Sequence, residues 1–250
     1  MKRENQKRIL SGGMLAMALA LPLIQSQVLQ SQDDHAEQVK EATKQSVKAG
    51  KVFDAIMKTP DKAIPQDLLA HAKAIAVFPQ VIKAAFIIGG EGGRGVVSRR
   101  TGAGWSDPVF FRAGGGSVGP QIGASATDIV LLFMNDDALE GLMKDKFELG
   151  AEAGVAGGPV GREASAGTDA LMHAKILLYS RSHGLFAGVN LKGVVISPED
   201  DLNVAVYNKT AHELLSDDVQ DSPGSDGLHT FSTTVGRYSK PSGTEQKPAN

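Results

Sequence analysis

The sequence predicts an α+β fold: a curved, mainly antiparallel, glycine-rich β-sheet or barrel-like core preceded by an amphipathic N-terminal helix and a second short helix. Apolar residues recur at helical spacing near the start of the chain, whereas short apolar runs separated by turn residues fill its middle. Of the 29 glycines, 22 lie between Gly89 and Gly193. Glycine inside strands marks bulges, sharp bends or close backbone approach, so this density predicts strong curvature.

The first 31 residues are interpreted as a secretory signal peptide. Four basic residues among the first eight precede an apolar run over 9–24, and a polar stretch follows. The run is shorter than the ~20 apolar residues that a membrane-spanning helix needs. We place the cleavage site between residues 26 and 31, and an uncleaved membrane anchor stays open as the alternative. The sequence therefore predicts an exported protein, periplasmic or secreted and peripheral to a membrane.

Residues 34–58 are predicted to form a helix with an apolar and a basic face. Apolar side chains, among them Phe53 and Ile56, recur at steps of three and four residues. The basic face consists of lysines at steps of four, four and three residues; we call these four residues the lysine row: Lys40, Lys44, Lys48 and Lys51. Pro65 is expected to open the second short helix, which continues through Leu68 and Leu69.

From residue 74 onward the pattern is typical of strands. Most of the apolar runs have Gly, Pro, Asn or Asp near their boundaries, which predicts short strands at 74–78, 84–88, 96–98, 109–111, 129–134, 175–179, 185–189, 194–196 and 202–207. Strict alternation over 147–155 predicts a further, half-buried strand. Residues 136–146 read as one amphipathic helix that Asn135 or Asp136 can cap. The glycine-rich segment 89–95 is expected to be a turn between two strands.

Composition excludes several classes of protein and site. The chain has no cysteine, so disulfide frameworks, thiolate metal sites and cysteine nucleophiles are absent. A net charge of −2 at pH 7 leaves no electrostatic footprint for nucleic acid. The six histidines show no metal-ligand spacing, and we predict neither a metal nor a cofactor. Residues 216–250 are polar with scattered apolar side chains, which predicts a flexible tail after a domain spanning 32–215.

Two glycine motifs suggest chemistry at residues 114–119. They satisfy G-x-G-x-x-G, but the glycine and proline that follow oppose the helix that a dinucleotide site requires. The same residues contain G-x-S-x-G, in which Ser117 would be the nucleophile of a serine hydrolase. That alternative stays open, since acidic and imidazole groups that could assist the serine follow at Asp169, His173, His183 and His212.

Several blocks of the sequence resemble the SYLF domain family, and they occur in the family's order over about residues 64–215. They are I-P-x-x-L-L-x-x-A-K-A-I-A-V-F-P at 64–79, the glycine segment 89–95, W-S-D-P at 105–108, G-S-V-G-P-Q-I-G at 116–123, G-G-P-V-G-R at 157–162 and Y-S-R-S-H-G-L-F-A-G-V at 179–189. The resemblance implies a lipid-binding domain rather than an enzyme, and makes Ser117 part of a structural glycine block. Eukaryotic relatives bind phosphoinositides through an amphipathic helix at the start of the domain, and some bind actin.

We therefore expect a non-catalytic protein that associates with anionic phospholipids through its basic helix. Each lysine near an anionic surface contributes ~1 kcal/mol, or ~4 kcal/mol for the lysine row before screening by salt. For an exported protein, anionic glycerophospholipids of a bacterial envelope are the expected partners and actin is not. Two alternatives stay open: the lysines form a solvated face while the apolar residues pack on the sheet, or the helix docks a protein partner in an envelope scaffold. The expected contact residues are Lys40, Lys44, Lys48, Lys51, Phe53 and Ile56.

Overall fold

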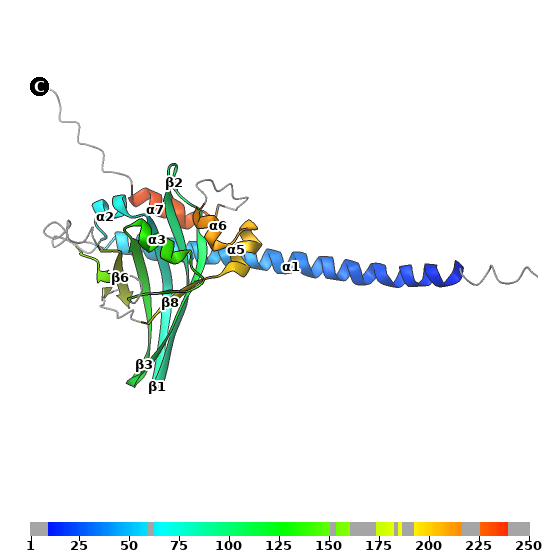
Figure 1. Cartoon of the computed structure of the whole chain (residues 1–250), viewed down its shortest axis with the longest axis horizontal. Helices are drawn as coiled ribbons and strands as arrows, with labels where there is room; N and C mark the ends of the chain where they lie inside the picture. Colours follow the sequence, from blue (N-terminus) through cyan, green and yellow to red (C-terminus); the bar gives the residue numbers. More distant parts are fainter. Residues whose placement is uncertain are drawn as a thin grey trace, which may run out of the picture.

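The chain forms a strongly curled, mainly antiparallel β-sheet with helices packed on it, which confirms the predicted α+β class (Figure 1). The computed structural model describes residues 10–59, 63–150, 154–160, 174–182, 185–186, 193–216 and 226–239, without the side chains of 10–33, 84–89, 117–124 and 185–186. The helices are α1 (Leu10–Met57), α2 (Gln66–His71), α3 (Asp136–Leu142), α5 (Asp200–Tyr207), α6 (Ala211–Ser216) and α7 (Thr230–Tyr238). The strands are β1 (Ala74–Thr101), β2 (Gly104–Trp105), β3 (Val109–Phe133), β4 (Phe147–Glu148), β5 (Val155–Gly157), β6 (Ile176–Ser182), β7 (Leu185–Phe186) and β8 (Val195–Pro198).

The centre of the sheet is a long antiparallel pair of strands, β1 and β3. Their register runs from Ala74 opposite Phe133 to Val97 opposite Val109. The turn predicted at 89–95 is therefore wrong, because this segment continues β1 and pairs with the second glycine-rich segment, with Gly90 opposite Gly116. Glycine lacks a side chain but keeps its N–H and C=O groups, so two glycine segments can still form a ladder.

Strand β1 curls back so that its two ends meet. The Arg100 N–H donates to the carbonyl O of Lys73 at 2.7 Å. A Cβ atom added to Gly95 would stand 2.5 Å from the carbonyl O of Val77 and would collide with the ring of Phe78. The register shifts between Phe78 and Val81, and again between Phe86 and Ile88, where the pairing is irregular. At Gly95, the curl of β1 therefore depends on the absence of a side chain, as the density of glycine in the sequence predicts.

Both faces of the sheet are buried where the two ends of β1 lie. Along β1, Ala74, Ala76 and Phe78 join one cluster, while Ile75 and Val77 join the other. The first cluster includes residues of α3 and α6, and the second includes residues of α1, α2 and α7. Continuous apolar runs are expected for strands that are covered on both sides.

Two further sequence predictions need correction. Residues 202–207, predicted as a strand, belong to helix α5, since a short apolar run does not distinguish a strand from a buried helix. Asn203 of α5 is buried, and its side chain donates to the Phe110 carbonyl O at 3.1 Å and accepts from the Phe110 N–H at 2.9 Å. These are the two backbone groups of Phe110 that a neighbouring strand would otherwise bind.

The second correction concerns the tail after residue 216. Residues 230–238 form α7, in which Phe231 and Val235 are fully buried. Leu228, Phe231, Val235 and Tyr238 recur at helical spacing, and this pattern outweighs the polar composition around them.

Helix α1 projects from the body as one continuous helix, drawn in blue in Figure 1. It begins at Leu10, inside the predicted signal peptide, and side chains 34–38 are exposed. No helix in the described part of the chain is long and apolar enough to cross a membrane.

Candidate functional site

The lysine row lies on the solvent side of α1. All four of its lysines are exposed, and they fall within an arc of about 80° at about 100° per residue. The fully buried apolar residues of the same helix are centred about 150° away; they are Ala42, Ala49, Phe53 and Ile56. Lys44 makes only a long contact with Glu41, at 3.9 Å. The four ammonium groups are therefore available to an external anionic surface.

Phe53 and Ile56 lie elsewhere than the membrane model requires. Both have zero exposure and belong to the core cluster beneath α1. The hypothesis that they contact lipid is incompatible with this conformation, because their apolar surface is already used against the sheet and α7. The alternative in which the apolar residues pack on the sheet describes these two residues correctly.

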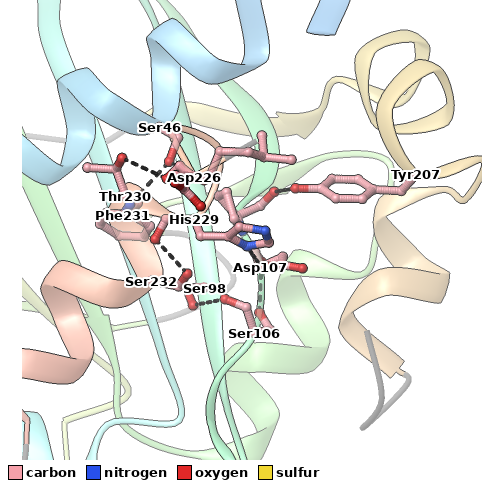
Figure 2. A network of polar contacts seen from close by, with 12 residues as sticks. Ser46, Ser98, Ser106, Asp107, Tyr207, Asp226, His229, Thr230, Phe231 and Ser232 are labelled. Atoms are coloured by element: carbon pink, nitrogen blue, oxygen red, sulfur yellow. Dashed lines mark hydrogen bonds and ion pairs between the residues drawn. The ribbon is translucent and has the colours of Figure 1, made fainter. Parts of the chain in front are cut away.

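Helix α7 fixes the position of α1 through a buried serine. The Ser46 hydroxyl donates to the carbonyl O of Leu228 at 2.5 Å. It accepts from the Phe231 N–H at 3.1 Å (Figure 2). The ring of Phe53 contacts Phe231 and Tyr238 edge-on, with centroid separations of 6.4 and 6.1 Å. The polar composition of residues 226–239 led to the prediction of a flexible tail. The spacing of their apolar residues would have predicted a helix.

A second polar group joins the ends of α1 and α7. Lys58 Nζ lies 2.8 Å from Asp54 Oδ2, and the Tyr238 hydroxyl donates to Asp54 Oδ1 at 2.7 Å. Hydrogen bonds from Lys58 and then Tyr238 lower the pKa of Asp54. The same carboxylate raises the pKa of both partners. The pair of helices is thus held by charge as well as by apolar packing.

Residues 105–108 connect α7, α5 and the sheet. Asp107 Oδ1 lies 2.5 Å from His229 Nδ1, at the start of α7 (Figure 2). The carbonyl O of Pro108 accepts from the Tyr207 hydroxyl at 2.8 Å, and burial raises the pKa of Tyr207, so its donor proton is retained. Trp105 Nε1 donates to Ser239 Oγ at 2.6 Å.

Ser106 completes this segment and argues against a catalytic triad. Its hydroxyl accepts from the Arg99 N–H and donates to the Asp107 carbonyl O, while its own carbonyl O accepts from Ser98 Oγ. The nearby Ser232 hydroxyl donates to the backbone carbonyl O of His229 rather than to its ring (Figure 2). The serines around the Asp107–His229 pair bind backbone groups and hold the segment in place.

Comparison with known proteins identifies the family. Residues 114–235 match the family model Ysc84, described as "Las17-binding protein actin regulator". The chain belongs to the Ysc84 family. The matched range extends from β3 to α7, so it contains the helix that positions α1, whereas the lysine row precedes it.

Relatives of the chain occur in yeasts and mammals. It is 34% identical over 193 residues to the SH3 domain-containing protein PJ696.02 of Schizosaccharomyces pombe, covering 73% of this chain and 45% of the relative. It is 35% identical over 188 residues to LAS seventeen-binding protein 3 of Saccharomyces cerevisiae, covering 73% and 40%. For the SH3 domain-containing YSC84-like protein 1 of Rattus norvegicus the identity is 34% over 174 residues, covering 68% and 51%. The chain thus spans about half the length, or less, of these relatives.

The backbone of the chain does not support a nucleophile elbow at Ser117. A nucleophile elbow needs a sharp turn from a strand into a helix. Ser117 instead lies within the uninterrupted strand β3, opposite Gly89 of β1, and its side chain is outside the described residues. Of the groups proposed to assist it, Asp169, His173 and His183 also lie outside that part of the chain, and His212 is exposed on α6.

The described part of the chain offers little to a metal ion. Among these residues, no three His, Asp or Glu side chains gather in a group that could hold one. His229 is paired with Asp107, and the ring of His71 contacts the Asp67 carbonyl O of its own helix. The candidate site that remains from the sequence is the lysine row.

Proposed function

We propose that the chain is a non-catalytic protein that binds membranes rich in anionic phospholipids through the lysine row of α1. The observation that carries this proposal is the exposure of Lys40, Lys44, Lys48 and Lys51 on one side of a helix whose opposite side is buried. Because the sheet and α7 hold the helix, the four lysines are presented together on its solvent side. Their placement on one side suits a flat anionic surface.

The proposed contact is electrostatic, without insertion into the bilayer. An amphipathic helix that lies in a membrane buries its apolar face among the acyl chains. In α1, Phe53 and Ile56 are enclosed by protein, so insertion would require the helix to leave its core. Glu37 precedes the lysine row, and Glu41 lies between its first two lysines. Their negative charges weaken the attraction between the lysine row and an anionic membrane, which favours reversible association.

Vesicle co-sedimentation tests the proposal. The full chain is mixed with vesicles of phosphatidylcholine alone or of phosphatidylcholine and phosphatidylglycerol in equal parts. Replacing Lys40, Lys44, Lys48 and Lys51 together by Gln should weaken binding to the anionic vesicles by at most about 1,000-fold at low salt, since each lysine contributes ~1 kcal/mol. Unchanged binding of this variant would contradict the proposal.

A control variant separates position from total charge. Replacing Lys73, Lys144, Lys146 and Lys209 by Gln lowers the net charge by the same amount but leaves the lysine row intact. We expect this variant to bind anionic vesicles nearly as well as the unaltered chain. If both variants lose the same affinity, only the overall charge matters, and the lysine row is not the site.

The second candidate is a protein-binding module. The family description, "Las17-binding protein actin regulator", favours it. Co-sedimentation with actin filaments, with the same two lysine variants, is the direct test. Binding to filaments without binding to anionic vesicles would replace the lipid proposal by this one.

We also propose that the chain is exported, with cleavage between residues 26 and 31. The support is the basic start and the apolar run over 9–24. Cleavage there would shorten α1 but leave residues 34–57, including the lysine row, at the start of the mature chain. Mass spectrometry of the protein recovered from cells would give the mature N-terminus. An intact residue 1 in a cytosolic fraction would contradict export.

A further inference from the structure

Lys58 extends the basic side of α1 beyond the lysine row. It directly follows the helix, and its N–H donates to the Asp54 carbonyl O at 3.0 Å, so the helical turn continues through it. Lys58 lies about five complete turns after Lys40, which places the two lysines on the same side of the helix. Its side chain is 67% exposed. The exposed lysines therefore follow one side of the helix for about 27 Å, at ~1.5 Å per residue.

Helix α7 adds a further cation at this end of α1. The two helices pack along each other, as their positions in Figure 1 show. The Arg237 side chain of α7 is 62% exposed, and its Nη1 lies 3.8 Å from Asp54 Oδ1. Thr233, one turn earlier on α7, is exposed as well. One side of α7 thus faces solvent next to the basic side of α1.

The carboxylate between these two cations neutralises only one of them. Asp54 Oδ2 lies 2.8 Å from Lys58 Nζ, and Oδ1 lies near Arg237. Among the described residues, Asp54 is the one carboxylate within ion-pair distance of Lys58 or Arg237. An exposed ion pair contributes little to stability, so the packing of α1 on α7 does not explain the second cation. That cation remains available to an external anion.

We propose that Lys58 and Arg237 bind lipid phosphates as a second part of the membrane site, so that α7 as well as α1 faces the bilayer. This inference rests on the proposed membrane binding through the lysine row. Ammonium and guanidinium groups both donate charge-assisted hydrogen bonds to phosphate oxygens. Charges on a single helix would let the domain rotate about the axis of α1, whereas a contact on a second helix fixes which side faces the membrane.

Replacing Lys58 and Arg237 together by Gln tests the proposal by co-sedimentation with vesicles that contain phosphatidylglycerol. Each cation near an anionic surface strengthens binding about fivefold at low salt, so this variant should bind about 25-fold more weakly. The matched control replaces Lys73 and Lys175 by Gln; these exposed lysines lie 3.3 and 3.1 Å from carboxylates of α3. Helix α3 packs on the other face of the sheet from α1, so the control should bind as the unaltered chain does. Equal losses in both variants would overturn the proposal.

A charge-conserving exchange separates contact with lipid from the packing of α1 on α7. Lys58→Arg combined with Arg237→Lys keeps both positive charges and should bind the vesicles nearly as well as the unaltered chain. Circular dichroism shows whether each variant is folded. A loss as large as that of the Gln variant would mean that the arrangement of the helices, and not the charge, is needed, and it would overturn the proposal.

Asp54→Asn gives a test in the opposite direction, because it should strengthen binding while it lowers the stability of the fold. With the carboxylate removed, one more positive charge acts on the membrane, so binding to the anionic vesicles should become about fivefold tighter at low salt. Asp136→Asn removes an exposed carboxylate that is paired with Lys73 on the other face of the sheet, and it should change nothing. Unchanged or weaker binding of Asp54→Asn, or an equal gain in Asp136→Asn, would overturn the proposal.

The orientation of the bound domain can be measured directly, since the chain has no cysteine of its own. A fluorophore is attached to Thr233→Cys on α7 or to Glu140→Cys on exposed α3 surface. Vesicles whose headgroups carry a quencher should quench the label on α7 more strongly than the label on α3. Equal quenching, or stronger quenching on α3, would overturn the proposal.

The outcomes distinguish this inference from the proposed function. If replacing the lysine row by Gln abolishes binding while the Gln variant of Lys58 and Arg237 behaves like its control, membrane binding stands and this inference fails. If the unaltered chain binds anionic vesicles no better than neutral ones, both fail.

Discussion

Gly95 is the residue at which the curl of β1 depends most directly on glycine. A Cβ atom there would stand 2.5 Å from the Val77 carbonyl O and would also overlap the Phe78 ring. Both neighbours are fully or almost fully buried and cannot move aside without disturbing the core. We expect Gly95→Ala to lower the free energy of unfolding by about 1–3 kcal/mol, as overpacking does.

Urea unfolding measures this effect, with Gly116→Ala as the matched control. Gly116 also lies in the glycine-rich part of the strand pair, but a Cβ atom there would have nothing within 4 Å. The control should be neutral or slightly stabilising, because alanine restricts the unfolded chain more than glycine does. Equal destabilisation by both replacements would contradict the explanation by close approach.

Asp54 gives the stability of the chain a defined dependence on pH. Its pKa is lowered in the folded protein, first by the hydrogen bond from Lys58 and then by that from Tyr238. Because the pKa of Asp54 is lower in the folded than in the unfolded chain, where it is about 3.9, its ionised form stabilises the fold at any pH above that unfolded pKa. This stabilisation is lost as the pH falls through the pKa of the folded state. Asp54→Asn should therefore lower the Tm at pH 7, and the difference from the unaltered chain should shrink below about pH 4.

Thermal unfolding followed by circular dichroism between pH 7 and pH 3 checks this prediction. Asp145→Asn replaces an exposed carboxylate elsewhere and serves as the control. A difference in Tm between Asp54→Asn and the unaltered chain that stays constant down to pH 3 would show that the carboxylate charge has no part in the effect.

At the scale of elements, one buried hydroxyl links α1 to the start of α7. Ser46 is fully buried and serves two backbone groups at the start of α7, the Leu228 carbonyl O and the Phe231 N–H. In Ser46→Ala both groups lose their partner, which should cost about 1–3 kcal/mol of unfolding free energy. Ser125→Ala, at an exposed position of β3, should change it by less than about 0.5 kcal/mol.

Hydrogen exchange distinguishes this local effect from a general one. We expect Ser46→Ala to speed exchange of amides in α7 and in the facing part of α1 before those of β1 and β3, because regions open in separate units. Uniform acceleration over all amides would mean that α7 does not open separately from the sheet.

Sequence patterns correctly predicted the helices and strands in which the spacing of apolar residues matches the face that is buried in the fold. The helix over 34–58 and the short helix opened by Pro65 are both present, within α1 and as α2. The strand runs at 74–78, 84–88 and 96–98 are strands too, but they join into one strand, β1. The sequence did not predict that they join, because glycine inside a strand weakens it. Here the glycine-rich segment of β3 pairs with that of β1, so the strand continues.

The candidate site was predictable only in part. Steps of three and four residues placed the four lysines on one face, and their exposure agrees with that prediction. The same periodicity could not decide whether Phe53 and Ile56 face a bilayer or a core, since either environment accepts them. The ion pair between Arg94 of β1 and Glu199 before α5 joins residues far apart in the sequence, and no local pattern predicts such a contact.

At the scale of the whole molecule, the buried apolar face of α1 predicts how membrane binding responds to salt. The Debye length shortens from about 10 Å at 0.1 M salt to about 3 Å at 1 M salt, so a purely electrostatic contact should be lost across this range. Vesicle co-sedimentation at increasing NaCl should fall to the level seen with neutral phosphatidylcholine vesicles. Binding that persists at 1 M NaCl would indicate that α1 leaves the core and inserts.

The hydrogen bond from Ser46 to Leu228 joins positions 182 residues apart in the sequence. During synthesis, α1 is made before the sheet, and α7 is made after it. Closing so long a loop costs entropy before any contact compensates for it, which makes such pairing a late event in folding. The part of the apolar side of α1 that faces α7 therefore stays uncovered until α7, the last of the described helices, has been made.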